Sequence, residues 1–204
     1  QQDECALQSQ LGAAAADFSA ELCEIPGLSV DEHARASTTM ESLGKLPPVF
    51  SKTGSVTAGN ASGITDGASA LVVASDAFVK KHNLQPLARY LGGVVVGLEP
   101  ARMGLGPVPA IQAYRSKFGN DFQRYEINEA FAAQVLACQK DLQLDPNTLN
   151  VKGGSIAIGH PIGCSGARIT TTLIHGLRER GGGRGLASLC VSGGLGICAG
   201  FEVS

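Results

Sequence analysis

Short apolar runs alternate with segments of helical periodicity over the second half of this chain. Runs typical of buried strands lie at 87–98, 124–128, 186–191 and 196–203, and a further one precedes His160. Segments typical of helices lie between them, at 106–118, 130–142 and 166–180. Strands that alternate with helices predict an α/β fold whose sheet is covered on both faces. In such folds the loops that leave the carboxyl ends of strands carry the chemistry.

The first half of the chain is less regular. Residues 1–16 contain strong helix formers from the first position and no initial Met, so we expect the chain to begin inside a helix. The polar segment that follows has no clean period, and Thr38 or Thr39 is expected to cap a short helix ending at Lys45. The run 69–74 predicts a buried strand, followed by a helix that Ser75 or Asp76 caps.

Composition narrows the class of partner. Of the 204 residues 44% are hydrophobic and 17% charged, which is typical of a globular chain with a substantial core. The net charge of -2 and the lack of any Lys/Arg-rich run argue against nucleic acid and anionic membranes as partners. No apolar stretch is long enough for a membrane span. The six cysteines are scattered and include no CxxC pair, so the sequence suggests neither a metal site nor a disulfide framework. We expect them to be reduced thiols of an intracellular protein.

A single histidine lies within a glycine-rich run from Gly153 to Gly166. Glycine lets a ligand approach the main chain closely, so this setting favours an imidazole, His160, that is offered to a substrate. The alternative is a glycine-rich turn with an ordinary surface histidine. Cys164 is close enough in sequence to form a Cys/His pair with His160, although spacing alone does not fix the directions of the side chains.

Two further residues lie where strands are expected to end. Asn128 lies at a strand-to-helix turn, where its amide can hold a water or an oxyanion, or can simply cap the helix. Cys190 ends an apolar strand beside a glycine-rich turn. A buried cysteine is usually an inert small hydrophobe, but a thiol beside free backbone N–H groups can also exchange a proton where charge develops.

Three motifs, Asn-Glu-Ala-Phe at 128–131, Gly-His-Pro at 159–161 and Cys-Val-Ser-Gly-Gly at 190–194, resemble the C-terminal half of the thiolase family in order and spacing. The runs 54–68 and 103–110 extend the resemblance over essentially the whole chain. It implies the five-layered α/β/α/β/α thiolase fold. Three regions are expected: part of the inserted loop domain at 1–55, the end of the N-terminal half at 56–100 and the C-terminal half at 101–204.

The same resemblance implies an acyl-CoA C-acyltransferase of fatty-acid metabolism and beta-oxidation. Its reaction is the thiolytic cleavage of 3-ketoacyl-CoA or the reverse Claisen condensation of acetyl-CoA. His160 matches the histidine that assists the nucleophilic thiol and contributes to the oxyanion hole. Asn128 matches the residue that positions a water in that hole, and Cys190 matches the acid/base cysteine that exchanges a proton with the α-carbon of acetyl-CoA.

Coenzyme A and acetyl-CoA are implied as substrates, with no permanently bound cofactor. Ser62 matches a serine beside the pantetheine arm, Phe50 and Phe131 match aromatic residues of its tunnel, and Arg35 is expected near the nucleotide end. Family members are homodimers or homotetramers. The final residues 201–204 are not a Ser-Lys-Leu signal, which favours the cytoplasm or the mitochondrion over the peroxisome.

One departure from the family pattern bears on activity. The family's nucleophilic cysteine lies in the first half of the polypeptide, and no residue of this sequence matches it, so these residues alone are expected to be inactive. The alternative is a non-catalytic thiolase-like protein that binds CoA esters or a partner subunit. Related condensing enzymes of fatty-acid or polyketide synthesis lack the acid/base cysteine, so Cys190 argues against them.

Overall fold

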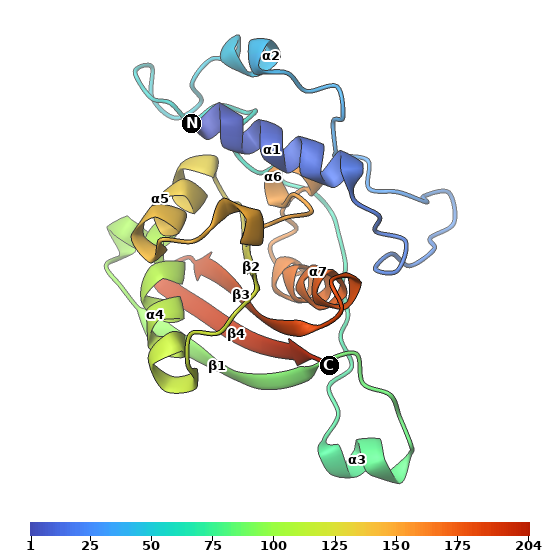
Figure 1. Ribbon diagram of the computed structural model, residues 1–204. Coiled ribbons are helices and arrows are strands. Elements are labelled where there is room, and N and C mark those ends of the chain that lie inside the picture. Colours follow the sequence, from blue (N-terminus) through green and yellow to red (C-terminus); the bar gives the residue numbers. More distant parts are fainter.

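The computed structural model describes residues 1–204 and is built around one four-stranded sheet (Figure 1). Its strands are β1 (Arg89–Gly97), β2 (Arg124–Ile127), β3 (Gly183–Val191) and β4 (Leu195–Val203). They lie in the order β1-β4-β3-β2, with β2 parallel to β3 and the other pairs antiparallel. The alternating pattern of the second half therefore predicted the four strands of this sheet correctly.

Helices cover both faces of the sheet, as the pattern predicted (Figure 1). On one face, α4 (Pro107–Phe118) packs on β1, β3 and β4, with α5 (Ala132–Leu142) beside it. On the other face, α7 (Ser165–Glu179) packs on β2 and β3. Neighbouring residues of β3 point to opposite faces, so Leu186 belongs to the core under α4 while Ala187 belongs to the core under α7.

A tight hairpin joins β3 to β4. Val191 pairs with Leu195 across it, and Gly193 and Gly194 both have positive φ, at 83° and 88°. Glycine adopts this conformation without a steric penalty, which explains the glycine pair in the sequence. The Gly194 carbonyl accepts a hydrogen bond from the Leu98 N–H at 2.8 Å. This contact fastens the hairpin to the end of β1 and fixes the strand end that carries Cys190.

The amino-terminal helix α1 (Gln2–Ala15) lies across α5 and the short helix α6 (Ser155–Ile158) (Figure 1). The approach is close enough that a Cβ at Gly153, where φ is +74°, would collide with the Ser9 carbonyl. The remaining helices are α2 (Met40–Gly44), α3 (Asp76–Lys81) and the 3-10 turns η1 (Pro100–Leu105) and η2 (Pro146–Thr148). None of the helices combines the length and the apolar run that crossing a bilayer requires.

Two of the expected strands are wrong. Residues 69–74 lie in no strand and in no β-bridge, and Val72 and Val73 are 99% and 85% exposed. No neighbouring strand lies beside them to complete a ladder. The apolar run before His160 forms the single helical turn α6 between Gly154 and Gly159. The helix predicted at the amino terminus and the caps at Thr39 and Ser75 are confirmed.

Candidate active site

Asn128 and Cys190 lie at the same edge of the sheet. Asn128 directly follows β2, and its backbone N–H donates to the Ser188 carbonyl of β3 at 3.0 Å. Cys190 lies two residues further along β3. Because β2 and β3 are parallel, both side chains are carried at the carboxyl end of the sheet, where α/β folds place their chemistry.

His160 reaches this edge from the loop after α6 rather than from a strand end. Gly159 has a φ of +91° and turns the chain there, and the His160 N–H donates to the Gly63 carbonyl at 2.9 Å. The imidazole Nε2 lies 3.3 Å from Asn128 Nδ2. The structure thus brings together the two candidate residues His160 and Asn128 from segments 32 positions apart.

The hydrogen bonds of Ser165 fix the proton on His160. His160 Nδ1 lies 2.6 Å from Ser165 Oγ, which itself donates to the Pro161 carbonyl at 3.0 Å. A hydroxyl has one proton, so Ser165 must accept here and Nδ1 must carry the hydrogen. Burial, and second the positive charge of Arg168, lower the pKa of His160. The imidazole is therefore neutral, with an unprotonated Nε2 toward Asn128.

The two cysteines near the site differ in position. Cys164 does not pair with His160, because the neighbouring Ser165 occupies the Nδ1 position. Cys190 is half-buried at the end of β3, and burial raises the pKa of its thiol. Cys190 is therefore a neutral thiol, which is the form that can donate a proton.

Three of the four residues expected to contact coenzyme A lie together. Residues 60–62 run antiparallel to 130–132: Ser62 donates both N–H and Oγ to the Ala130 carbonyl at 3.1 Å. The ring of Phe131 meets that of Phe50 edge-on, with centroids 5.9 Å apart, and Phe50 is 75% exposed. Arg35 is anchored only through its backbone: its N–H donates to Gln10 Oε1, and its carbonyl accepts from the N–H and the Oγ1 of Thr38. Its guanidinium makes no hydrogen bond or ion pair.

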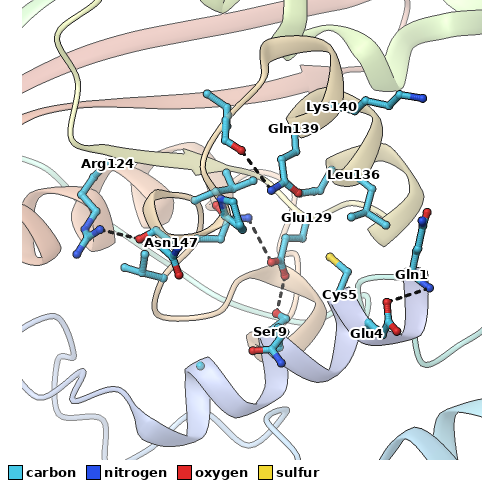
Figure 2. A pocket seen from close by; sticks show the side chains of 18 of the residues that line it. Gln1, Glu4, Cys5, Ser9, Arg124, Glu129, Leu136, Gln139, Lys140 and Asn147 are labelled. Carbon is cyan, nitrogen blue, oxygen red and sulfur yellow. Dashed lines mark hydrogen bonds and ion pairs between the residues drawn. The ribbon is translucent and has the colours of Figure 1, made fainter.

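Glu129, next to Asn128, is a structural residue that the sequence did not reveal as such. Its buried carboxylate accepts a hydrogen bond from Ser9 Oγ at 2.6 Å (Figure 2). It also accepts from the Ile156 N–H at 3.1 Å and from Asn150 Nδ2 at 3.2 Å. These bonds join α1, the single turn of α6 and the segment after η2. Burial raises the pKa of Glu129 in spite of its three donors. The signal in the sequence was a carboxylate placed two residues after the end of strand β2.

A cavity of about 990 Å³ lies beside this network and not at His160. Figure 2 shows it between α1 and α5, with Cys5 and Leu136 on its walls and Glu129 at its inner side. Neither His160 nor Cys190 lines it. The cavity is therefore a separate feature from the site at the sheet edge.

Glu126, on β2, gives the fold a pH dependence. Burial raises the pKa of this carboxyl from 4.5 to about 8; the charges of Glu129 and Glu21 raise it further, and those of Arg168 and Lys152 oppose the shift. Glu126 is protonated in the folded state but ionises near its ordinary pKa once the chain unfolds. The stabilisation of the folded state by neutral Glu126 is complete below the ordinary pKa of 4.5 and is lost as the pH rises through about 8.

We therefore expect the free energy of unfolding to fall by on the order of a few kcal/mol between about pH 5 and pH 8. Urea denaturation at a series of pH values measures the slope. Glu126→Gln keeps the shape of the side chain and removes its titration, so it should flatten the dependence. Equal slopes for the two proteins would contradict the assignment.

Comparison with known proteins places this geometry in a family. The thiolase N-terminal domain matches residues 1–77, and the thiolase C-terminal domain matches residues 84–203. The mitochondrial 3-ketoacyl-CoA thiolase of Bos taurus is 55% identical over 178 residues, which cover 86% of this chain and 45% of that protein. The acetyl-CoA acetyltransferase of Escherichia coli is 48% identical over 216 residues, covering 98% of this chain and 55% of that protein.

Solved structures agree over the whole chain. The acetyl-CoA acetyltransferase of Bacillus anthracis superposes with a TM-score of 0.93 at 47% identity, covering 100% of this chain and 55% of that chain. Human mitochondrial 3-ketoacyl-CoA thiolase in complex with CoA superposes with a TM-score of 0.91 at 46% identity, again with 100% and 55% coverage. The chain spans about half the length of the relatives it matches. Over that half its fold is that of the thiolases, and with both domains matched in order the chain belongs to the thiolase family.

Proposed function

We propose that this chain forms part of the active site of an acyl-CoA C-acyltransferase that cleaves 3-ketoacyl-CoA with coenzyme A, or runs the reverse Claisen condensation. The observation that carries the proposal is the pair of nitrogens, His160 Nε2 and Asn128 Nδ2, 3.3 Å apart at the sheet edge where β3 delivers Cys190. The names of the relatives, 3-ketoacyl-CoA thiolase and acetyl-CoA acetyltransferase, support the same class of reaction.

The two nitrogens can form an oxyanion hole once His160 is protonated. In the resting site the unprotonated Nε2 accepts from Asn128 Nδ2. When His160 Nε2 takes a proton from an attacking thiol, His160 Nε2 and Asn128 Nδ2 are both donors. They then no longer form a hydrogen bond with each other. A thioester oxygen that gains negative charge, or a water held there, then accepts from both. Donors aimed at a developing charge are a large source of rate enhancement.

Cys190 supplies the second proton transfer. In cleavage, the bond between the α- and β-carbons of the 3-ketoacyl group breaks, and its electron pair stays on the acetyl-CoA fragment as an enolate. The neutral Cys190 thiol gives that carbon a proton, and the thiol proton of the incoming coenzyme A replaces it. The products are acetyl-CoA and an acyl-CoA shortened by one acetyl unit, and in condensation Cys190 acts as the base. The thiol that first takes the acyl group is not among the residues assigned here.

The cluster of Ser62, Phe50 and Phe131 is proposed to hold the pantetheine arm of coenzyme A. The exposed Phe50 ring and its edge-on contact with Phe131 give an apolar wall beside the isolated antiparallel bridge next to Ser62. The unpaired Arg35 guanidinium is available for the phosphates at the nucleotide end. Coenzyme A acts here as a substrate, and no permanently bound cofactor is required.

We propose a homodimer or homotetramer in an intracellular, reducing compartment, either the cytoplasm or the mitochondrial matrix. All six cysteines are free, in keeping with a reducing environment. The relatives from Bos taurus and human carry mitochondrial in their names, whereas the relatives from Escherichia coli and Bacillus anthracis are bacterial. The assignment of 1–55, 56–100 and 101–204 to loop domain, N-terminal half and C-terminal half belongs to this proposal.

The test uses the purified protein at the length at which the cell makes it. With acetoacetyl-CoA and coenzyme A present, we expect acetyl-CoA to form and the reaction to stop when coenzyme A is omitted. Mass spectrometry of the same sample gives the length of the polypeptide. Binding of acetoacetyl-CoA without turnover would instead support the alternative, a non-catalytic thiolase-like subunit that binds CoA esters.

A further inference from the structure

A chain of hydrogen bonds leads from the candidate site into the interior. Asn128 Oδ1 accepts from Ser155 Oγ at 2.7 Å, and Ser155 Oγ accepts from Arg168 Nη2 at 2.7 Å. Ser155 is the first residue of α6 and is fully buried, while Arg168 lies on α7. The three side chains therefore connect the end of β2 with the two helices that precede and follow the His160 loop.

Counting protons along this chain gives a single orientation for the Asn128 amide. A guanidinium only donates hydrogen bonds, so Ser155 Oγ must accept from Arg168. The one hydroxyl proton of Ser155 is then donated to its other neighbour. That neighbour must be an acceptor, which places the Asn128 oxygen toward Ser155 and the amide nitrogen toward His160. His160 Nε2 must then be unprotonated. Ser165, on the opposite side of the ring, independently requires the same arrangement, with the proton on Nδ1.

We propose that Ser155 and Arg168 are positioning residues that hold the Asn128 amide with its nitrogen toward His160. This inference rests on the function proposed above, in which Asn128 Nδ2 is a donor to the reacting oxygen. If the amide were reversed, its oxygen would meet that oxygen and repel it. Its oxygen would also favour a proton on Nε2, which would prevent His160 from accepting one from a thiol.

Burying the Arg168 guanidinium in this way costs stability, which is expected only if the residue has a function. A buried cation needs compensation, yet the Nε and Nη1 groups of Arg168 are buried without a hydrogen-bond partner. Nη2 of the guanidinium donates to the Ser155 hydroxyl. Arg168 forms no ion pair, because no carboxylate lies within ion-pair distance of it. A helix-to-helix contact with no further role could be made by apolar side chains.

The experiment compares Ser155→Ala and Arg168→Met with the native-length protein, labelled with 15N-histidine. Long-range 1H–15N correlations identify which ring nitrogen of His160 is protonated, and the His160→Gln variant assigns the signal. Thr170→Val is the matched control: it removes a buried hydroxyl from α7 whose hydrogen bond goes only to the Gly166 carbonyl. Circular dichroism and urea midpoints establish that each variant is folded.

In the native protein and in Thr170→Val we expect His160 to be protonated on Nδ1. In Ser155→Ala and Arg168→Met the Asn128 amide is free to turn, so a second population protonated on Nε2 should appear. In these two variants kcat for thiolysis should fall by roughly tenfold or more, with KM within about twofold. The control should keep both constants.

Two results would overturn the proposal: protonation of Nε2 in the native protein, or native protonation and kcat in both variants. If the native protein is inactive, the proposed function fails, while the NMR result still decides whether Ser155 and Arg168 orient the amide. Should either variant fail to fold, the other carries the test, because each removes a different link of the same chain.

Discussion

Replacing His160 with alanine is expected to lower kcat/KM for thiolysis by roughly 10³-fold, with the fold intact. In the proposed mechanism the ring both accepts a proton at Nε2 and then donates to the developing oxyanion, so its removal would abolish two contributions at once. The free energy of unfolding should change little, because the imidazole is half-buried on a loop. It forms hydrogen bonds with Asn128 and Ser165 and is not packed in the core. Steady-state assays with acetoacetyl-CoA and coenzyme A measure the effect.

His82→Ala is the matched control for this variant. His82 is exposed at the end of α3 and stacks only against Phe78, with ring centroids 4.3 Å apart, so turnover should not change. Cys190→Ala should lose activity to a similar extent, because in the proposed mechanism the Cys190 thiol exchanges the α-carbon proton. Turnover near that of the native protein in His160→Ala or Cys190→Ala would refute the role assigned to that residue.

The sequence predicted the sheet well because its signals are local. Strands β1 to β4 and helices α4, α5 and α7 each carry their own periodicity, so they could be identified without knowing their neighbours. The run before His160 has no such period. There the carboxylate of Glu129, 27 positions away, accepts the Ile156 N–H and stabilises one turn of helix. A contact of that kind leaves no trace in the apolar pattern itself.

The strand predicted at 69–74 is absent for a different reason. Its composition is that of a buried strand, but a strand forms only where a neighbouring backbone completes the ladder, and none lies beside these residues. Propensity describes the segment, whereas pairing depends on the rest of the fold.

For the site, the motifs predicted His160, Asn128 and Cys190 but not the side chains that form hydrogen bonds with His160 and Asn128 or with their partners. Ser155, Ser165 and Arg168 lie in a stretch rich in glycine and apolar residues, where a serine is typical of a turn and an arginine of an exposed helix face. Their roles depend on the directions in which they donate hydrogen bonds, and these directions emerge only when β2, α6 and α7 come together.

A second large effect is expected at the buried ion pair that fastens the segment after α1 to the rest of the fold. Lys152 Nζ lies 3.0 Å from Glu21 Oε1 and 2.6 Å from Glu179 Oε1, and donates to the Asp17 carbonyl at 3.1 Å. The side chains of Lys152 and Glu21 are only 8% and 7% exposed. Burial alone would lower the pKa of Lys152, but the bonds to Glu179 and Glu21 outweigh burial and raise it.

Lys152→Met should therefore lower the free energy of unfolding by about 3–5 kcal/mol, because it leaves the Glu21 carboxylate buried without its cation. Urea denaturation near neutral pH measures the loss. Part of it should return in the double variant Lys152→Met/Glu21→Gln, in which Thr172 still donates to the remaining side chain but no unpaired charge is buried.

The exposed pair of Lys45 and Glu41 gives the matched control. Both side chains are largely in solvent, 71% and 79% exposed, so Lys45→Met removes the same kind of ion pair at a cost below about 1 kcal/mol. Equal losses at the two lysines would contradict the prediction, since burial is the property that separates them. If the double variant were no more stable than Lys152→Met, the loss would come from the lysine's own packing against Phe18, whose ring its Nζ approaches to 5.4 Å, and not from the stranded carboxylate.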